Sequence, residues 1–205
     1  MRHFKHTLVC AITALMVAPL FGQDVVTLSI RDVIERQALL FPADGDTGVL
    51  LAHQSGKDAQ SWAGFAQRLQ DEGYASIALE SISTEDVMSG VEHLRQAGKT
   101  RIALIGGSIG GGGIQSAVSK GVPSEVVLVV LLGTASGNMA EANSIEKLFV
   151  ITQNDFFSAQ TYSSYDKAAD PKDLVVYPGK AHGQEMFDEP YGPQLVDLIL
   201  RALAN

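Results

Sequence analysis

The sequence predicts an α/β protein: a mostly parallel sheet of about eight strands with helices on both faces and no lid domain. Short apolar runs alternate with helix-like segments from residue 24 to the end of the chain. Several runs, such as "EVVLVVLLG" at 125–133, are almost continuously apolar, as is typical of strands covered on both faces. No repeat or low-complexity tract interrupts this alternation, which favours one parallel sheet in one domain.

Each predicted element has a local signal. The apolar runs predict strands over 25–30, 36–41, 48–53, 74–79, 101–106, 125–133, 147–153 and 173–179. Helical spacing, capping residues and terminal glycines predict helices over 61–73 and 83–98, a helix ending at 114–121, and helices over 158–169 and 192–204. In the first of these helices Trp62, Phe65 and Leu69 lie on one face.

The N-terminal segment has the composition of a secretory signal peptide. Arg2 and Lys5 precede the apolar run "TLVCAITALMVAPLF", which is too short to span a bilayer and ends at "GQD". We expect residues 1–23 to be removed between Gly22 and Asp24, leaving 24–205 as a secreted or periplasmic domain. An uncleaved membrane anchor is the alternative. A lipoprotein is disfavoured because Cys10 lies inside the run, after "TLV".

The composition of the mature chain excludes several classes of protein. Its formal charge is −10, because the leader takes two of the 15 basic residues and none of the 23 acidic ones. An anionic domain is a poor candidate for binding nucleic acid, and we expect no stable membrane insertion after cleavage. Cys10 is the only cysteine, so the mature chain has no disulfide, thiolate nucleophile or cysteine-ligated metal.

The stretch "RIALIGGSIGGGGI" (101–114) is the strongest chemical signal. It holds one serine, Ser108, between Gly106 and Gly110 at a strand-to-helix junction. This G-x-S-x-G pattern indicates a nucleophile elbow, a turn so tight that only small residues fit two places either side of the serine. We expect the further glycines, 111–113, to let the helix pack closely on the sheet or to leave space for substrate. A chance glycine-rich turn is the alternative. A phosphate-binding loop is excluded, since no Gly-Lys-Ser/Thr follows.

A serine nucleophile needs a base, and the mature chain offers three histidines. His182 lies in the loop after the last strand, bracketed by glycines, where an accessible imidazole is expected. It is therefore the predicted base. His93 is predicted to be a solvated helix residue. His53 ends the third strand, and a structural or oxyanion-side role is the favoured interpretation for it.

The orienting carboxylate is predicted to be Asp155, just past the strand "KLFVITQ" at the same sheet edge. The other nearby acids are interpreted as capping or surface charges, or as lying on the wrong side of the histidine loop: Asp166, Asp170, Asp173, Glu185 and Asp188.

Two backbone N–H groups are predicted to form the oxyanion hole, those of Ile109 and Gln54. Four further residues are candidates for lining a substrate pocket, with a core or wall role as the alternative: His53, Phe156, Phe157 and Met186.

The order Ser108, Asp155, His182, each after a different strand, resembles the α/β-hydrolase superfamily over nearly all of residues 25–205. "NDFFSAQTYSSYDKAADPKDLVVYPGKAHGQEMF" is similar to the acid-to-histidine segment of its small capless members, the dienelactone-hydrolase-like and short-chain esterase group. Two departures stand out. The usual His-Gly is His53-Gln54 here, and "ALESISTED" leaves no room for the usual loop after the fourth strand.

The resemblance implies a serine hydrolase with an open, shallow site, which cleaves small-molecule esters of short acyl groups and uses no metal or other cofactor. A peptidase or amidase with the same three residues stays open. So does a non-catalytic binding member of the fold, because a fold alone does not establish activity. The sequence leaves the oligomeric state open.

Overall fold

The computed structural model describes residues 22–31 and 33–205. All but the last two residues of the predicted leader lie outside this range, so its structure stays untested. Among the described residues, no helix has the length and apolar character that crossing a membrane requires.

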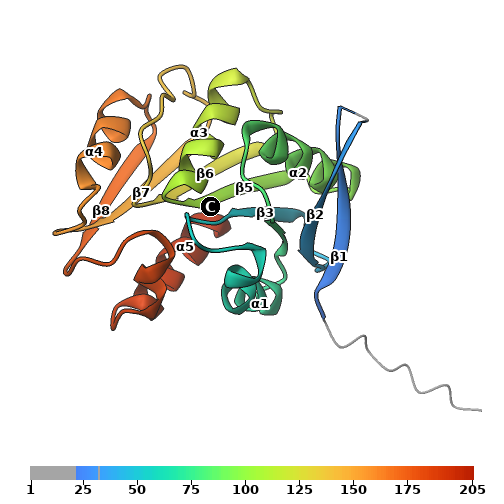
Figure 1. Ribbon diagram of the computed structural model, residues 1–205, viewed down its shortest axis with the longest axis horizontal. Helices are drawn as coiled ribbons and strands as arrows, with labels where there is room; N and C mark the ends of the chain where they lie inside the picture. The colour runs from blue at the N-terminus through green and yellow to red at the C-terminus, as the bar shows by residue number, and fades with distance from the viewer. Residues whose placement is uncertain (1–21, 32) are drawn as a thin grey trace, which may run out of the picture.

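The described chain forms one eight-stranded sheet, as predicted (Figure 1). The strands are β1 (Asp24–Ile30), β2 (Ile34–Phe41), β3 (Thr47–Ala52), β4 (Ala75–Leu79), β5 (Arg101–Gly107), β6 (Val126–Leu132), β7 (Glu146–Thr152) and β8 (Lys172–Tyr177). Their order across the sheet is β1-β2-β4-β3-β5-β6-β7-β8. β2 runs antiparallel to both β1 and β4, and the remaining pairs are parallel.

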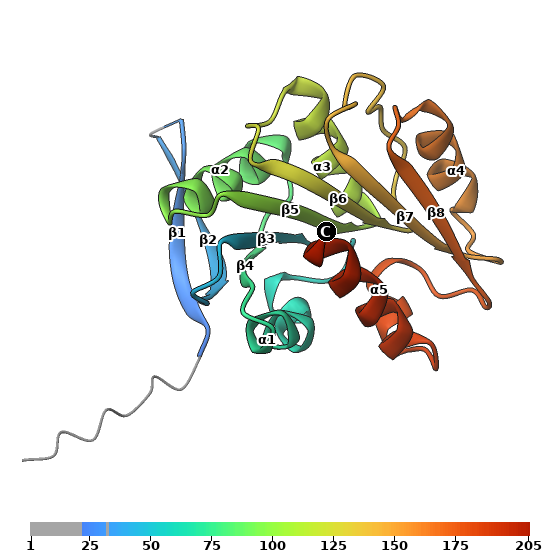
Figure 2. The ribbon, with the colours of Figure 1, turned by 180° about the vertical axis from the view of Figure 1, so that it is seen from behind.

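Five α-helices cover the two faces of this sheet. They are α1 (Ala63–Asp71), α2 (Thr84–Gln96), α3 (Ile109–Lys120), α4 (Ser158–Lys167) and α5 (Gly192–Ala204), with short 3-10 helices η1 (Ala59–Trp62) and η2 (Gly183–Asp188). Helices α1 and α5 lie on one face, and α2, α3 and α4 lie on the other (Figures 1 and 2).

Alternation along the strands divides the core into two layers. In β3, Leu50 and Ala52 pack in the layer under α2 and α3, whereas Val49 and Leu51 pack in the layer under α1 and α5. All four side chains are fully buried, which explains why this strand has a continuous apolar run.

The parallel register brings the carboxyl ends of the central strands to one edge. Ala52 at the end of β3 pairs with Gly106 in β5, and Gly107 pairs with Leu132 at the end of β6. The loops that follow β3, β5, β6, β7 and β8 therefore meet there, as is usual for sites in parallel sheets.

The glycines of α3 allow this helix to approach that edge. A methyl group on Gly110 would collide with the carbonyl of Ala52, and one on Gly113 with the carbonyl of Ile82. A methyl group on Gly111 would likewise collide with a side chain of the loop after β6. The expectation of close packing is confirmed, and it explains why the first turn of the helix accepts the conformational cost of glycine.

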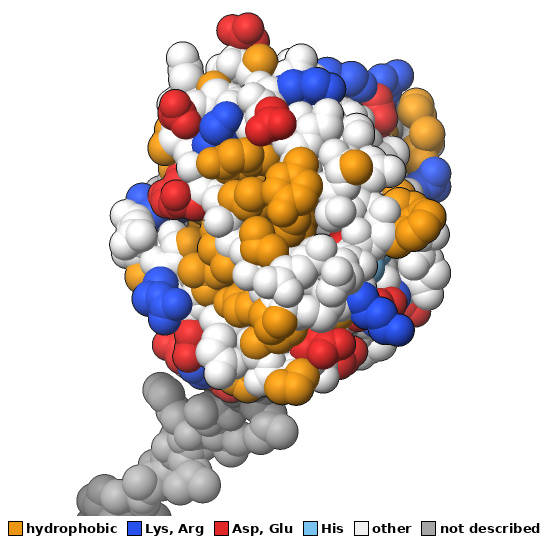
Figure 3. Space-filling model, turned by 90° about the vertical axis from the view of Figure 1, so that its left-hand side faces the viewer, with side chains coloured by type: hydrophobic (Ala, Val, Ile, Leu, Met, Phe, Trp, Pro, Cys, Tyr) orange, Lys and Arg blue, Asp and Glu red, His pale blue; other side chains and the backbone are white. Residues whose placement is uncertain are grey.

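The side of the molecule formed by α4, β8 and α5 carries a band of hydrophobic side chains between acidic and basic ones (Figure 3). β8 is the last strand of the sheet, and Val176 is 41% exposed there. The strand is only six residues long and begins with Lys172 and Asp173. Short length and charge are features that protect an edge strand from pairing with other chains.

Candidate active site

Ser108 occupies the turn between β5 and α3 in a strained backbone conformation, with φ at 49° and ψ at −116°. A non-glycine residue rarely adopts a positive φ, so the surrounding contacts must hold it. The Ser108 N–H donates to the carbonyl of Leu132 at 3.0 Å, and the Ser108 carbonyl accepts from the N–H of Ala135 at 3.0 Å. The turn is therefore fixed between the end of β6 and the loop that follows it.

Gly106 explains why this turn needs a glycine before the serine. A Cβ at this position would come 2.6 Å from the backbone nitrogen of Gly111, because the helix folds directly back over the strand. Together with Gly110, which faces the end of β3, it gives the geometry that the G-x-S-x-G spacing predicts for an elbow.

Asp155 and His182 form the direct side-chain contact that the sequence analysis expected of a base and its orienting carboxylate. The distance from His182 Nδ1 to Asp155 Oδ2 is 2.8 Å, and the Asp155 side chain is fully buried. Its other oxygen, Oδ1, accepts from the N–H of Phe157 at 2.8 Å. Because Nδ1 is held by the carboxylate, Nε2 is the ring nitrogen left for proton transfer.

Gly133, directly after β6, is a site residue that the sequence analysis missed. Its φ is 52°, and a Cβ there would lie 2.9 Å from both Asp155 Oδ2 and His182 Nδ1. The contact between Asp155 and His182 therefore lies against a backbone position that has no side chain. A glycine that ends the run "VVLVVLLG" was the available signal, but only the fold reveals what it faces.

The structure contradicts the prediction that the Gln54 N–H is a free oxyanion donor. This N–H donates to Gln184 Oε1 at 2.9 Å, and the Gln184 N–H donates in return to Gln54 Oε1 at 2.6 Å. Both side chains are buried, and Gln184 Nε2 donates onward to Ser61 Oγ at 2.9 Å. We call this reciprocal pair the amide clasp. It joins the loop after β3 to the loop that carries His182, and it occupies the predicted donor.

Two other backbone N–H groups are available near Ser108. Ile109 is the first residue of α3, and the first N–H groups of a helix have no partner within it. Ser55, one residue beyond Gln54, lines the cavity at Ser108, and within the described residues its N–H has no hydrogen-bond acceptor. Ser55 therefore replaces Gln54 as the candidate for the second donor.

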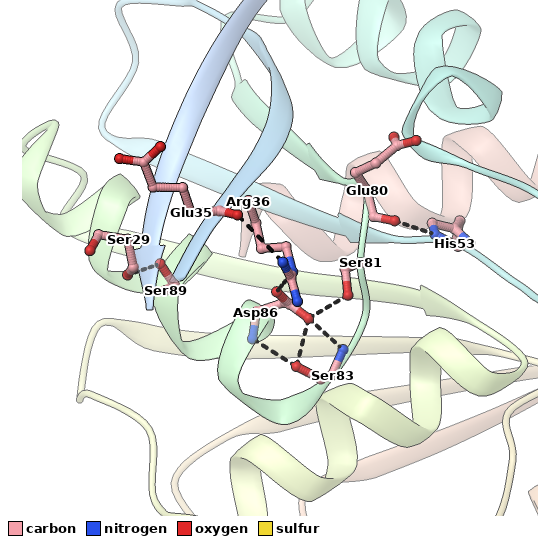
Figure 4. Close-up of polar contacts among 9 residues, drawn as sticks. All are labelled: Ser29, Glu35, Arg36, His53, Glu80, Ser81, Ser83, Asp86 and Ser89. Atoms are coloured by element: carbon pink, nitrogen blue, oxygen red, sulfur yellow. Dashed lines mark hydrogen bonds and ion pairs between the residues drawn. The ribbon is translucent and has the colours of Figure 1, made fainter. Parts of the chain in front are cut away.

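His53 lies beside the site but does not line its cavity. Its Nδ1 contacts the carbonyl oxygen of Gln54 at 2.8 Å. Its Nε2 contacts the carbonyl oxygen of Glu80 at 3.3 Å, as Figure 4 shows. The predicted short connection after β4 is confirmed, since only residues 80–83 separate it from α2. His53 thus ties this short loop to the end of β3, which is a structural contact.

The same short loop is fixed at its other end by Asp86 in α2. The Asp86 carboxylate accepts from the Ser81 hydroxyl at 2.7 Å and from the Ser83 hydroxyl at 2.6 Å (Figure 4). Arg36 Nε lies 3.8 Å from it. These contacts form the N-terminal cap of α2 and fix the short loop after β4.

A cavity of about 420 Å³ brings the site residues together. Its lining comprises Gln54, Ser55, Ser108, Ile109, Gly133, Ala135, Phe157, Gln160 and His182. Phe157 is thus at the cavity as predicted, whereas Phe156 lies outside the lining and is 90% exposed. The prediction for Met186 is wrong: residues 183–188 form η2, which turns this side chain into the core, where it is fully buried.

Gln160 is a second residue that the sequence analysis missed. It lies on α4, lines the cavity, and its Oε1 is buried with no hydrogen-bond partner among the described residues. An unpaired buried acceptor costs free energy unless a ligand or water satisfies it. The structure therefore leaves one unpaired amide oxygen on α4 beside the cavity.

The remaining titratable candidates do not line this cavity. His93 is half-buried on α2 rather than solvated, and burial lowers its pKa. Asp166, Asp170 and Asp173 are exposed, as expected for surface charges. Glu185 accepts from the backbone N–H of His182 at 3.4 Å, so it supports the histidine loop rather than the imidazole.

Comparison with known proteins identifies the fold. No family model and no curated protein matches the sequence. Solved structures do match. A dienelactone hydrolase from Anabaena variabilis has 19% identity and a TM-score of 0.73, over 87% of this chain and 94% of its own. Carboxyl esterase 2 from Tuber melanosporum has 14% identity and a TM-score of 0.73, over 94% and 88%.

An esterase from Exiguobacterium antarcticum has 11% identity and a TM-score of 0.70, over 87% of this chain and 99% of its own. Identities this low establish architecture rather than activity. The protein has the α/β-hydrolase fold, with eight strands and helices on both faces of the sheet in its described residues. The catalytic roles of Ser108, Asp155 and His182 stay predictions.

Proposed function

We propose that this protein is an exported serine hydrolase that cleaves carboxylic esters of small or short acyl groups. The observation that carries the proposal is the 2.8 Å contact between His182 Nδ1 and Asp155 Oδ2. His182 lines the same cavity as Ser108, whose backbone has a strained, positive φ. An ordinary surface turn is not expected to combine a strained serine with a histidine–carboxylate contact, because the strained backbone conformation costs about 1–3 kcal/mol.

In the proposed mechanism, Ser108 Oγ attacks the ester carbonyl carbon, and His182 Nε2 takes the hydroxyl proton. The tetrahedral intermediate collapses as His182 returns that proton to the leaving alcohol, which leaves an acyl-enzyme. Water, deprotonated by His182, then attacks the acyl carbon. The bond from this carbon to Ser108 Oγ breaks, His182 returns the proton to Oγ, and the acid is released. Asp155 keeps the imidazole in the tautomer that has its proton on Nδ1, and stabilises the imidazolium when it forms.

The negative charge on the carbonyl oxygen requires donors that are in place before the reaction. We propose the N–H groups of Ile109 and Ser55 for this role, because that of Gln54 is held by Gln184. Loss of one such donor lowers turnover by about 10²–10³-fold in well-studied serine hydrolases.

The names of the structural neighbours support ester cleavage: a dienelactone hydrolase and two esterases. A peptidase or amidase with the same three residues is the second candidate, and it would differ in accepting an amine leaving group. Export rests on the basic and apolar pattern of residues 1–23.

The test is release of nitrophenol from p-nitrophenyl acetate and butyrate by the protein and by Ser108→Ala. Hydrolysis by the parent protein and its loss in the variant are expected, with His93→Ala as a matched histidine control that retains activity. Faster turnover of the matching p-nitroanilides would favour the amidase. If neither substrate is cleaved and an organophosphate fails to label Ser108, the protein is a non-catalytic binding member of the fold.

A further inference from the structure

We propose that Phe156 and Phe157 form an apolar extension of the cavity that binds the aryl or arylalkyl group of a larger ester. This deepens the proposed function and rests on it. The two phenylalanines, called here the aromatic lip, would select esters with a ring two or three bonds from the scissile carbonyl over small aliphatic ones.

The lip begins inside the site. The Phe157 ring centroid lies 5.1 Å from that of the His182 imidazole, and Phe157 lines the cavity. Phe156 continues outward from it, with ring centroids 5.1 Å apart and planes at 85°, an edge-to-face pair. An apolar path therefore runs from the imidazole to the outer surface.

Phe156 does not contribute to the core. Its side chain is 90% exposed, the largest exposure among the large hydrophobic residues of the described chain, while Phe157 is 46% exposed. Burying a phenylalanine is worth about 1.5–3 kcal/mol, so a side chain left in water forgoes that stabilisation. A ligand that covers the ring would recover it.

The backbone that carries the lip is held by two hydrogen bonds. The N–H of Phe157 donates to Asp155 Oδ1 at 2.8 Å, and the N–H of Ser158 donates to the Asp155 carbonyl at 3.1 Å. The carboxylate that contacts His182 thus also fixes the turn that carries both rings. A backbone already fixed before binding reduces the conformational entropy that is lost when a ligand binds.

The size of the cavity indicates why an extension is useful. Its volume of about 420 Å³ lies near the lower end of the roughly 300–1,000 Å³ range of ligand sites. The other apolar side chain at its mouth, Ile109, is 45% exposed. An ester with an aromatic group would fill the cavity and place its ring against Phe157 and Phe156.

The experiment compares three esters by titrating the acid released: methyl acetate, benzyl acetate and methyl 3-phenylpropanoate. The last two carry a phenyl ring on the alcohol side and on the acyl side. The protein is expected to prefer at least one of them to methyl acetate in kcat/KM. Phe156→Ala should reduce this preference about two- to tenfold, mainly through KM, as expected for loss of an aromatic contact.

Phe156→Tyr should restore the preference, and Val25→Ala, which alters a 65% exposed side chain on β1, should leave it unchanged. Equal preference in the parent protein and in Phe156→Ala would overturn the proposal. So would a dimer in sedimentation velocity that dissociates on Phe156→Ala, because a second copy would then cover the ring. Absence of Ser108-dependent cleavage of all three esters would instead overturn the proposed function itself.

Discussion

Gln54 and Gln184 hold each other through two hydrogen bonds of opposite sense, each backbone N–H donating to the other residue's side-chain oxygen. The two residues are 130 positions apart in the chain, yet both lie next to residues at the centre of the proposed chemistry. The amide clasp thus fixes the distance between the oxyanion loop and the histidine loop. It also gives the buried side chain of Gln54 a hydrogen-bond partner.

Gln184→Leu should lower kcat/KM for p-nitrophenyl acetate by about 10- to 100-fold, because a displacement of about 1 Å in a catalytic group has an effect of this size. It should also reduce the free energy of unfolding by about 1–3 kcal/mol, since the buried Gln54 N–H loses its acceptor. Steady-state kinetics and urea unfolding measure the two effects.

The matched control for this variant is Gln70→Leu. Gln70 is also buried, near the C-terminal end of α1 and outside the cavity lining, and its side chain donates to the carbonyl of Pro42 at 2.7 Å. It should lose stability but keep kcat/KM. Unchanged or higher activity in Gln184→Leu would contradict a positioning role for the clasp.

Gly133→Ala should reduce kcat by at least about 10²-fold. The new methyl group would lie 2.9 Å from Asp155 Oδ2 and His182 Nδ1. The two side chains must therefore shift from their present positions, which displaces the imidazole. A positive φ adds backbone strain of about 1–2 kcal/mol for any L-residue with a side chain. Steady-state kinetics on p-nitrophenyl acetate measure kcat. Circular dichroism verifies that the variant is fully folded in the same sample.

Gly64→Ala serves as the control, because Gly64 is exposed in α1 and an added Cβ there meets no atom within 4 Å. It should keep full activity and gain about 0.5–1 kcal/mol of stability from higher helix propensity. Equal kcat in the two alanine variants would argue against the contact at Gly133.

Tyr191 should make the fold sensitive to alkaline pH. Burial, the first cause, and the nearby Glu189 raise the pKa of Tyr191 to about 12, and its ring stacks on Tyr177 at 4.4 Å. A group whose folded-state pKa is raised contributes stability that is complete below its unfolded pKa, 10.0, and is lost as the pH rises through about 12. The free energy of unfolding should therefore fall between pH 10 and pH 12.

Tyr191→Phe should weaken this decline, and urea unfolding at pH 9 and pH 11 measures it. At pH 9 the variant should be at least as stable, because the Tyr191 hydroxyl is buried without a partner among the described residues. A decline equal to that of the parent protein would show that other groups cause the alkaline loss.

The predicted leader implies a defined N-terminus if the protein is exported as proposed. When the full-length chain is expressed in a bacterium and recovered from the periplasm or the medium, N-terminal sequencing should begin at Gln23 or Asp24. A protein that stays in the membrane fraction with Met1 intact would support the alternative of an uncleaved anchor.

The sequence predicted features whose cause is local. The turn at Ser108 needs small residues two places away on either side. Its pattern can therefore be recognised in five consecutive residues of the sequence. Asp155 and His182 were found because they follow apolar runs, and parallel strands bring such positions to one edge.

The errors concern contacts between distant segments. Gln54 was predicted to offer its N–H to substrate, but Gln184 accepts that bond from another loop. Met186 was predicted to face substrate, but a short helix rotates it into the core. The glycine at 133 was visible at the end of an apolar run, but its role depends on the side chains that lie beside it in the fold.

The single tryptophan is also placed to report on this part of the molecule. Trp62 is 1% exposed, and its ring lies 5.9 Å, edge-on, from that of Phe187 in η2, the helix that follows His182. Undocking of the histidine loop would expose the indole to water and shift its emission to longer wavelength. Intrinsic fluorescence therefore follows assembly of the site in real time, without an attached dye, during refolding or on addition of an ester.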